Sequence, residues 1–117
     1  MIEQIKKMIE EFGIRLWCSR QWLADDNIKI YVRVTKHYLP DGEVVKTIDL
    51  SSIEVEEAHR GRGLFTRKLE EIELLASERG FTIYVESILN ERLIPFFEKR
   101  GYRRVDNLQS MFLRPDK

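Results

Sequence analysis

The sequence predicts an α+β fold in which helices flank a β-sheet. Alternating apolar residues over 28–35 predict a half-buried strand, and apolar residues at spacings of three and four over 65–76 predict an amphipathic helix. Glycines stand where helices would end. The predicted order is helix, two strands, helix, strand, helix and two strands, an arrangement typical of a sheet flanked by helices.

The composition predicts a single domain spanning residues 1–117. The 20 Lys and Arg residues balance the 20 Asp and Glu residues, so the formal net charge is zero, which disfavours a general nucleic-acid binder. No apolar run has the length of a membrane span or the form of a signal peptide. The single cysteine, Cys18, excludes an internal disulfide, and no Cys/His spacing indicates a metal. We therefore expect a cytoplasmic protein with no membrane association and no metal.

The first third of the chain predicts a helix and then a less defined segment. Apolar residues with helical spacing run from Ile2 to Phe12, and Gly13 is expected to end the helix. Residues 14–27 stay open, because alternation over 14–18 fits a short strand in which Cys18 would be buried, whereas 19–26 also fits a helical turn. A strand over 28–35 follows, and Pro40-Asp41-Gly42 predicts a turn.

The strand after this turn changes phase. Its apolar residues are first even-numbered, Ile48 and Leu50, and then odd-numbered, Ile53 and Val55. A slip of one residue turns the second half to the wrong face unless a β-bulge at Ser51-Ser52 accommodates the extra residue. Two short strands with a kink at Ser51-Ser52 are the alternative.

The second half predicts two more helices and three strands. A helix after Gly63 ends at Gly80, and residues 82–86 form a strand. Asn90 is a good N-cap for a helix that runs to Arg100 and ends at Gly101. Residues 102–105 and 110–113 complete the pattern as two strands.

The turn His59-Arg60-Gly61-Arg62-Gly63-Leu64 lies between a strand and a helix. A helix N-terminus offers free N–H groups and the positive end of the helix dipole, and glycines allow an anion to approach the backbone. Residues 59–68 contain four Arg or Lys residues and no acidic one. The turn is therefore a candidate phosphate cradle, although it has neither the P-loop nor the GxGxxG spacing.

Two segments resemble motifs of the GNAT N-acetyltransferase superfamily. Residues 53–65, IEVEEAHRGRGLF, are similar to its acyl-coenzyme A binding motif, Q/R-x-x-G-x-G/A after a bulged strand. Residues 90–102, NERLIPFFEKRGY, are similar to its second motif. The resemblance is close over residues 53–105 and loose before residue 28. It implies a mixed, mainly antiparallel sheet with a bulged central strand.

The resemblance implies acetyl-CoA as cofactor and assigns residues to it. Main-chain groups of Ile53 and Val55 would pair with the pantetheine arm, and Asn90 would reach the same arm. Phe65 departs from the usual glycine or alanine, so its ring is expected to point into the core. The backbone amides around the pyrophosphate would be those of Arg60, Gly61, Arg62, Gly63, Leu64 and Phe65.

The resemblance also indicates catalytic candidates. An ammonium must lose a proton before its nitrogen attacks a thioester, and a carboxylate can accept that proton. Glu86 ranks first for this role, followed by Asp49 and Glu54. Phe97 occupies the position where family members often carry a tyrosine as general acid, and phenylalanine donates no proton.

Together these patterns predict an N-acetyltransferase that moves an acetyl group from acetyl-CoA to a primary amine of a protein or small molecule, by direct attack in a ternary complex. A non-catalytic acyl-CoA-binding or protein-interaction module is the alternative. A nucleic-acid binder that uses Arg60, Arg62 and three later arginines ranks third. His37 and His59 are expected to be exposed, without an Asp or Ser partner, and pairing into a homodimer stays open.

Overall fold

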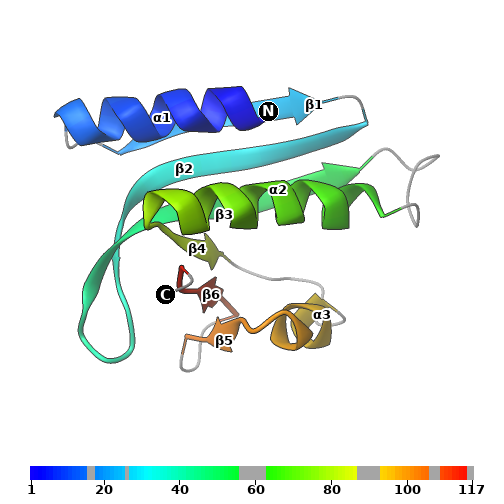
Figure 1. The fold of residues 1–117 in the computed structure, drawn as a ribbon. Coiled ribbons are helices and arrows are strands. Elements are labelled where there is room, and N and C mark those ends of the chain that lie inside the picture. Colours follow the sequence, from blue (N-terminus) through cyan, green and yellow to red (C-terminus); the bar gives the residue numbers. More distant parts are fainter. Residues whose placement is uncertain (16–17, 26, 56–62, 87–92, 106–108, 116–117) are drawn as a thin grey trace.

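The computed structural model describes residues 1–15, 18–25, 27–55, 63–86, 93–105 and 109–115 (Figure 1). Its helices are α1 (Ile2–Arg15), α2 (Leu64–Arg79) and α3 (Leu93–Lys99). Its strands are β1 (Ser19–Asp25), β2 (Ile28–Tyr38), β3 (Val44–Val55), β4 (Thr82–Val85), β5 (Arg103–Arg104) and β6 (Met111–Leu113). Across these residues the strand order is β1-β2-β3-β4-β6-β5, with β3 parallel to β4 and the other neighbours antiparallel. The predicted fold class is confirmed.

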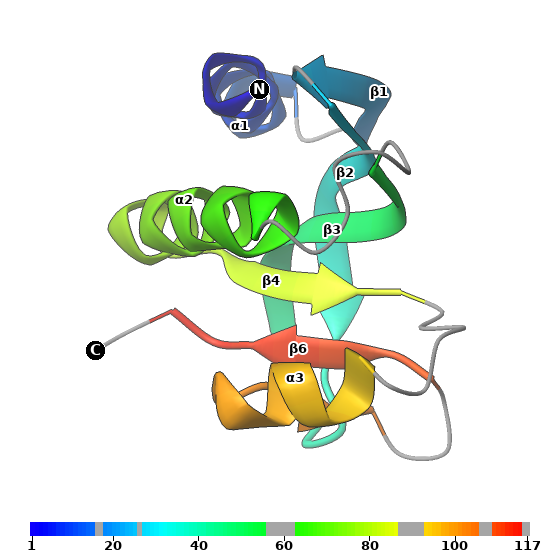
Figure 2. The ribbon, with the colours of Figure 1, turned by 90° about the vertical axis from the view of Figure 1, so that its right-hand side faces the viewer.

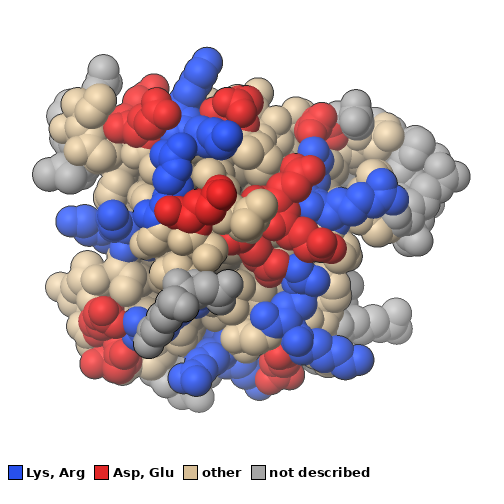
Figure 3. All heavy atoms as spheres, in the orientation of Figure 1, with Lys and Arg blue, Asp and Glu red and all other residues tan. Residues whose placement is uncertain are grey.

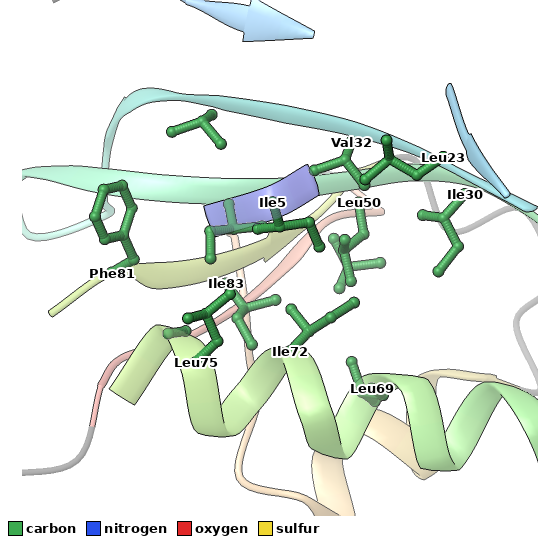
Figure 4. Packing of buried hydrophobic residues seen from close by; sticks show 14 of the residues in the cluster. Ile5, Leu23, Ile30, Val32, Leu50, Leu69, Ile72, Leu75, Phe81 and Ile83 are labelled. Carbon is green, nitrogen blue, oxygen red and sulfur yellow. The ribbon is translucent and has the colours of Figure 1, made fainter. Parts of the chain in front are cut away.

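One face of the sheet carries the main core. Val34, Ile48 and Ile83 are register partners across β2, β3 and β4, so they share this face, and each is at most 1% exposed. Figure 2 shows α1 and α2 on the same side of these strands. Figure 4 shows side chains of α1, α2 and the strands packed together. The helices contribute Ile5, Met8, Ile9, Phe12, Leu69, Ile72, Leu75, Ala76 and Phe97 to this cluster.

The opposite face of the sheet has a different character. Its second, smaller cluster contains Leu39, Tyr84, Val105 and Phe112, and none of the three described helices contributes a buried residue to it. Tyr84 is the register partner of Asp49 on β3, which places polar side chains of the central strands on this face. This polar face is the one that carries the candidate site.

The predicted bulge in β3 is confirmed by the strand register. Ile53 pairs with Ile30 and Leu50 pairs with Val32, so two residues of β3, Ser51-Ser52, lie opposite one residue of β2. The extra residue lets Leu50 and Ile53 both contact the main core, although the sequence changes phase between them. A single strand with a bulge is therefore present, and the alternative of two short strands is wrong.

Three expectations for the N-terminal third need correction or completion. Gly13 does not end the first helix, because α1 continues to Arg15 and Gly13 is not among the described glycines with positive φ. The segment left open contains β1, whose residues pair with β2 from Ser19 to Asp25. Cys18 is exposed and not in the core. Pairing with the long neighbouring strand β2 determines that this segment is a strand, whereas its local sequence pattern does not.

The second half follows the sequence more closely. Gly63 and Gly80 flank α2 in left-handed conformation, with φ of +75° and +73°, as expected for positions that favour glycine. Thr82–Val85 forms β4, and the described part of the third helix begins at Leu93. Asn90, its predicted N-cap, lies outside the described residues.

Leu69→Ala and Leu74→Ala compare a buried and an exposed leucine on α2. Leu69 is 0% exposed and Leu74 is 64% exposed. The first substitution leaves a cavity in the main core, so the free energy of unfolding is expected to fall by about 2–5 kcal/mol. The second should change it by less than about 0.5 kcal/mol. Urea unfolding followed by circular dichroism measures both, and equal effects would contradict the described packing of α2.

Candidate active site

The parallel pair β3 and β4 separates beside the bulge. Pairing runs from Thr47 with Thr82 to Leu50 with Val85, and the Glu86 N–H then donates to the Leu50 carbonyl at 3.0 Å. β3 continues to Val55, and on this side its last residues have no strand partner within the described part of the chain. Main-chain groups of Ile53 and Val55, both predicted to bind cofactor, lie along this stretch of β3. The strand therefore offers donors and acceptors to an extended ligand.

The N-terminus of α2 follows the end of β3 along the chain. By helix geometry the N–H groups of Leu64, Phe65 and Thr66 have no acceptor within the helix. No side chain among the described residues caps this end, and the first turn contains no acidic residue. A Cβ placed on Gly63 would meet no atom within 4 Å, so the approach to this glycine is open among the described residues. These features suit an anion.

The structure describes only part of the predicted cradle. Arg60, Gly61, Arg62 and Asn90 lie outside the described residues, whereas Gly63, Leu64 and Phe65 lie within them. Phe65 is half-buried and packs against the main core, with its ring centre 5.9 Å from that of Phe96 and 6.1 Å from that of Phe97. The expectation that this ring points into the core is confirmed.

A polar cluster of four side chains lies on the polar face where β3 and β4 separate. Asp49 of β3 is 1% exposed and accepts a hydrogen bond from Thr47 Oγ1 at 2.6 Å and from Arg33 Nε at 3.1 Å. His37 Nε2 lies 2.6 Å from Asp49 Oδ2. The Arg33 guanidinium also pairs with Glu86, directly after β4. We call Arg33, His37, Asp49 and Glu86 the charge cluster.

The two carboxyl groups of the charge cluster have pKa values shifted in opposite directions. Burial, reinforced by the neighbouring Asp49 carboxylate, raises the pKa of Glu86 above its usual range. Burial also acts on Asp49, but hydrogen bonds from His37 and its other partners outweigh it and lower the pKa of Asp49. Two neighbouring carboxyl groups with separated pKa values can take different roles. Glu86 is the group suited to accept a proton, and Asp49 stays ionised.

The charge cluster also has ligand types that bind metal ions. One ligand atom from each of His37, Asp49 and Glu86 lies within 4.8 Å of the others. The Arg33 guanidinium already bridges both carboxylates, with its Nη2 atom 3.0 Å from Asp49 Oδ2. Because a cation from the chain itself already pairs with both carboxylates, we interpret the cluster as a site of proton and charge chemistry.

The tyrosines differ in their relation to the charge cluster. Phe97 is fully buried among aromatic rings of the main core and donates no proton. Tyr102 also lies in that core, where its hydroxyl donates to Glu73 at 2.9 Å, and burial together with the Glu73 charge raises its pKa far above the usual value. Tyr84 stacks on His37 with ring centres 4.0 Å apart. Tyr84 is therefore the tyrosine that adjoins the charge cluster.

The structure corrects the expectations for His37 and separates Glu54 from the other carboxylates. His37 was expected to be exposed without an acidic partner, but it is half-buried, with 24% of its side chain exposed, and contacts Asp49. Glu54 is exposed and pairs in register with Lys29, so it is not part of the charge cluster. Arg33 received no role from the sequence. The position of the predicted turn could have indicated this contact. A hairpin whose turn is centred on Asp41 places residue 33 opposite residue 49 and residue 37 opposite residue 45.

The described part of the helical face carries side chains of both charges. Figure 3 shows Lys and Arg side chains intermixed with Asp and Glu on this face. Within the described residues, no helix combines the length and apolar character that crossing a membrane requires.

A comparison with models of known families assigns the chain to one family. Residues 4–102 match the model of the acetyltransferase (GNAT) family, and the chain belongs to this family. The resemblance found in the sequence is thus confirmed. No curated protein matches the chain significantly.

Several solved structures share the fold at low sequence identity. A tyrosine-to-phenylalanine variant of the AtaT toxin, bound to the C-terminus of the antitoxin AtaR and acetyl-CoA, is 14% identical with a TM-score of 0.59 over 75% of this chain. The match spans only 60% of that AtaT chain. The KacTA–DNA complex is 13% identical, with a TM-score of 0.61 over 96% of this chain and 79% of the other. AtaT complexed with acetyl-methionyl-tRNAfMet is 10% identical, with a TM-score of 0.59 over 97% and 79%.

The similar structures bear on the cofactor as well. AtaT with the AtaR C-terminus, and AtaTR, have been solved with acetyl-CoA bound. Together with the family match over residues 4–102, this supports acetyl-CoA as the cofactor that the motifs predicted.

Arg33→Gln is expected to raise the pKa of Glu86 further. A guanidinium beside a carboxylate favours its charged form, so removing that cation makes the bound proton more stable. A ¹³C NMR titration of the Glu86 carboxyl carbon measures the midpoint. Arg20→Gln is the matched control, because Arg20 is exposed and pairs in register with Arg33. A midpoint that stays constant or falls in Arg33→Gln would contradict the described ion pair.

Proposed function

We propose that this protein transfers an acetyl group from acetyl-CoA to a primary amine by direct attack in a ternary complex. The observation that carries the proposal is the charge cluster, in which Glu86 has a raised pKa at the point where β3 and β4 separate. An open strand edge and an uncapped helix N-terminus adjoin this point along the chain. Proximity and orientation of the two reactants would supply much of the rate.

The described residues fit the cofactor that the family requires. The main chain of Ile53 and Val55 would pair with the pantetheine arm, and the amides of Gly63, Leu64 and Phe65 would face the diphosphate. The open space around Gly63 and the acid-free first turn of α2 support this assignment. Arg60, Gly61, Arg62 and Asn90 complete the proposed set from outside the described residues. Bound acetyl-CoA supplies a thioester whose carbonyl carbon is open to attack.

We assign the proton acceptor to Glu86. The acceptor ammonium must lose a proton before its nitrogen can attack, and a carboxyl group with a raised pKa is a stronger base than an ordinary one. Arg33 holds the Glu86 carboxylate in place, and the buried Asp49 stays ionised beside it. Main-chain N–H groups at the β3 bulge are the donors that we assign to the acyl oxygen.

The acceptor is an amine on a protein or a small molecule in this proposal. AtaT complexed with acetyl-methionyl-tRNAfMet shares the fold, so an aminoacylated RNA belongs in the panel of acceptors to be tested. The balanced charge of the chain does not favour nucleic acid over the other classes. Purified protein with acetyl-CoA and this panel is expected to release coenzyme A thiol with at least one acceptor, as measured with a thiol reagent.

The buried Phe97 supports a second candidate function. A module that binds acyl-CoA without turnover would need no phenol at this position. Acetyl-CoA binding by calorimetry, with no thiol release for any amine in the panel, would favour the module over the enzyme.

Glu86→Gln is expected to lower turnover at pH 7 by about 10²- to 10⁴-fold while acetyl-CoA affinity stays constant, because an amide accepts no proton. In the unchanged protein, turnover should fall as pH drops through the raised pKa of Glu86, since the protonated carboxyl is no longer a base. The residual activity of the variant should lack this acidic limb.

Steady-state thiol release from pH 5 to 9 measures the Glu86 effect, with calorimetry for the cofactor. Glu10→Gln, at an exposed position of α1, is the control for a change of charge. Undiminished turnover in Glu86→Gln would move the base role to Asp49 or to water.

Gly63→Glu is expected to weaken acetyl-CoA binding by at least about 100-fold, because it puts bulk and negative charge where the diphosphate would lie. Gly80→Glu is the matched control at the other end of α2. Both glycines have left-handed φ and open surroundings, so both variants carry a similar backbone strain of about 1 kcal/mol. Equal affinities of the two variants by calorimetry would remove the assignment of the cradle.

A further inference from the structure

An exposed aromatic pair lies on the polar face beside the charge cluster. Trp22 of β1 is 45% exposed and is the register partner of Tyr31 on β2. The two rings meet edge to face, with their centres 5.3 Å apart. Tyr31 precedes Arg33 by two residues on β2, so both side chains project from the same face, about 7 Å apart. The pair therefore offers apolar area that a ligand bound at the charge cluster can cover.

Positively charged side chains adjoin this aromatic pair. The Lys29 ammonium lies 4.7 Å from the centre of the Trp22 ring, although the register partner of Lys29 on β3 is Glu54. Arg20 is exposed and is the register partner of Arg33, on the same face. Within the described residues no acidic side chain pairs with Arg20 or Lys29. This part of the polar face therefore has an apolar centre with cations beside it.

The polar face thus presents opposite charges to the two ends of a ligand. At one end Glu86 is the proposed proton acceptor, which the ammonium of the acceptor must reach. At the other end Arg20 and Lys29 repel an ammonium and attract an anion. An amine with a neutral ring would cover Trp22 and leave these cations without a partner, whereas a negative charge on the ring would complement them.

We propose that Trp22, Tyr31 and Lys29 form a specificity-determining surface for an acceptor amine that carries a flat ring with a negatively charged substituent. The inference rests on the proposed function and names its acceptor class. The ring would pack on Trp22 and Tyr31, the negative substituent would lie beside the Lys29 ammonium, and the amine would lie beside Glu86. Aromatic carboxylates and nucleotides both have this chemistry.

The test compares three amines of similar length. The compound 4-(3-aminopropyl)benzoate has a ring and a negative charge, 3-phenylpropylamine has only the ring, and 8-aminooctanoate has only the charge. Binding is followed without acetyl-CoA, through the ¹⁵N–¹H signals of the Tyr31 and Arg33 backbone amides, at a pH of about 8, where alkyl ammonium and carboxylate groups are charged. We expect the benzoate to bind on the order of tenfold more tightly than 8-aminooctanoate, because of its ring. It should bind about threefold more tightly than 3-phenylpropylamine, because of its charge.

Two substitutions separate the contributions of the ring and the charge. Trp22→Leu should reduce the preference for the benzoate over 8-aminooctanoate to about twofold and leave the preference over 3-phenylpropylamine unchanged. Lys29→Gln should abolish the preference over 3-phenylpropylamine and leave the other unchanged. Tyr38→Leu and Lys36→Gln are the matched controls, because both side chains are exposed on β2 but project from the opposite face to Arg33. Both preferences should stay unchanged in these controls.

The position of the amine is tested in the same titration. The ¹³C signal of the Glu86 carboxyl carbon should move with the same midpoint as the Tyr31 amide signal, because one ligand contacts both. Tyr31→Leu is a second variant, should Trp22→Leu not fold, and it should also lower the ring preference. Equal affinities for the three amines, an unchanged ring preference in both folded ring variants, the same loss in Tyr38→Leu, or a constant Glu86 signal would overturn the inference.

An aminohexyl derivative of adenosine monophosphate distinguishes the two sources of the proposed chemistry. Tighter binding of this nucleotide than of the benzoate would identify a nucleotide-linked acceptor, and the reverse order would identify an aromatic carboxylate. These measurements use binding alone. Absence of thiol release with every acceptor would therefore contradict the proposed function, whereas the affinity ratios test the aromatic surface itself.

Discussion

The bulge in β3 is the constraint on which both the core and the candidate site depend. With Ser51-Ser52 opposite a single residue of β2, Leu50 and Ile53 both contact the helical core although one residue too many separates them. The parallel pairing with β4 stops at the same place. One local irregularity thus keeps the hydrophobic face continuous and leaves the end of β3 open to a ligand.

The charge cluster depends on a second constraint, which is the cost of burying charge. Asp49 is almost completely buried, and an ionised carboxylate there requires partners. Thr47, Arg33 and His37 supply them from two neighbouring strands. The same arrangement brings Asp49 close to Glu86, where burial together with the neighbouring Asp49 carboxylate raises the pKa of Glu86. The contacts that stabilise the buried Asp49 carboxylate therefore also belong to the cluster in which the pKa of Glu86 is raised.

Membership of the acetyltransferase (GNAT) family connects these features to a reaction without defining the acceptor. The similar structures include toxins with protein, RNA and DNA partners, but their identity of 10–14% extends to the fold alone. The class of acceptor must therefore be inferred from the charged side chains of this protein. The polar face, which bears the charge cluster and receives no buried side chain from the described helices, is the place where an acceptor would meet Glu86.

The sequence alone determined the order of most elements, the bulge and the family, because each depends on local pattern. The phase change between Leu50 and Ile53 required a bulge, and the glycines at both ends of α2 defined that helix before any packing was known. Glu86 and Asp49 were identified as candidates from the family motifs.

Only the tertiary structure decided how the polar residues meet. The predicted turn indicates that residues 33 and 49 are opposite each other, but it assigns no role to Arg33 or His37, whose partners lie 12 to 53 residues away along the chain. Their contacts exist because β2, β3 and β4 align side by side with a fixed register. The presence of β1 was likewise set by pairing with β2, because a weak local pattern yields to a neighbouring strand. Electrostatic pairing acts through space, and only the folded register defines the distances over which it acts.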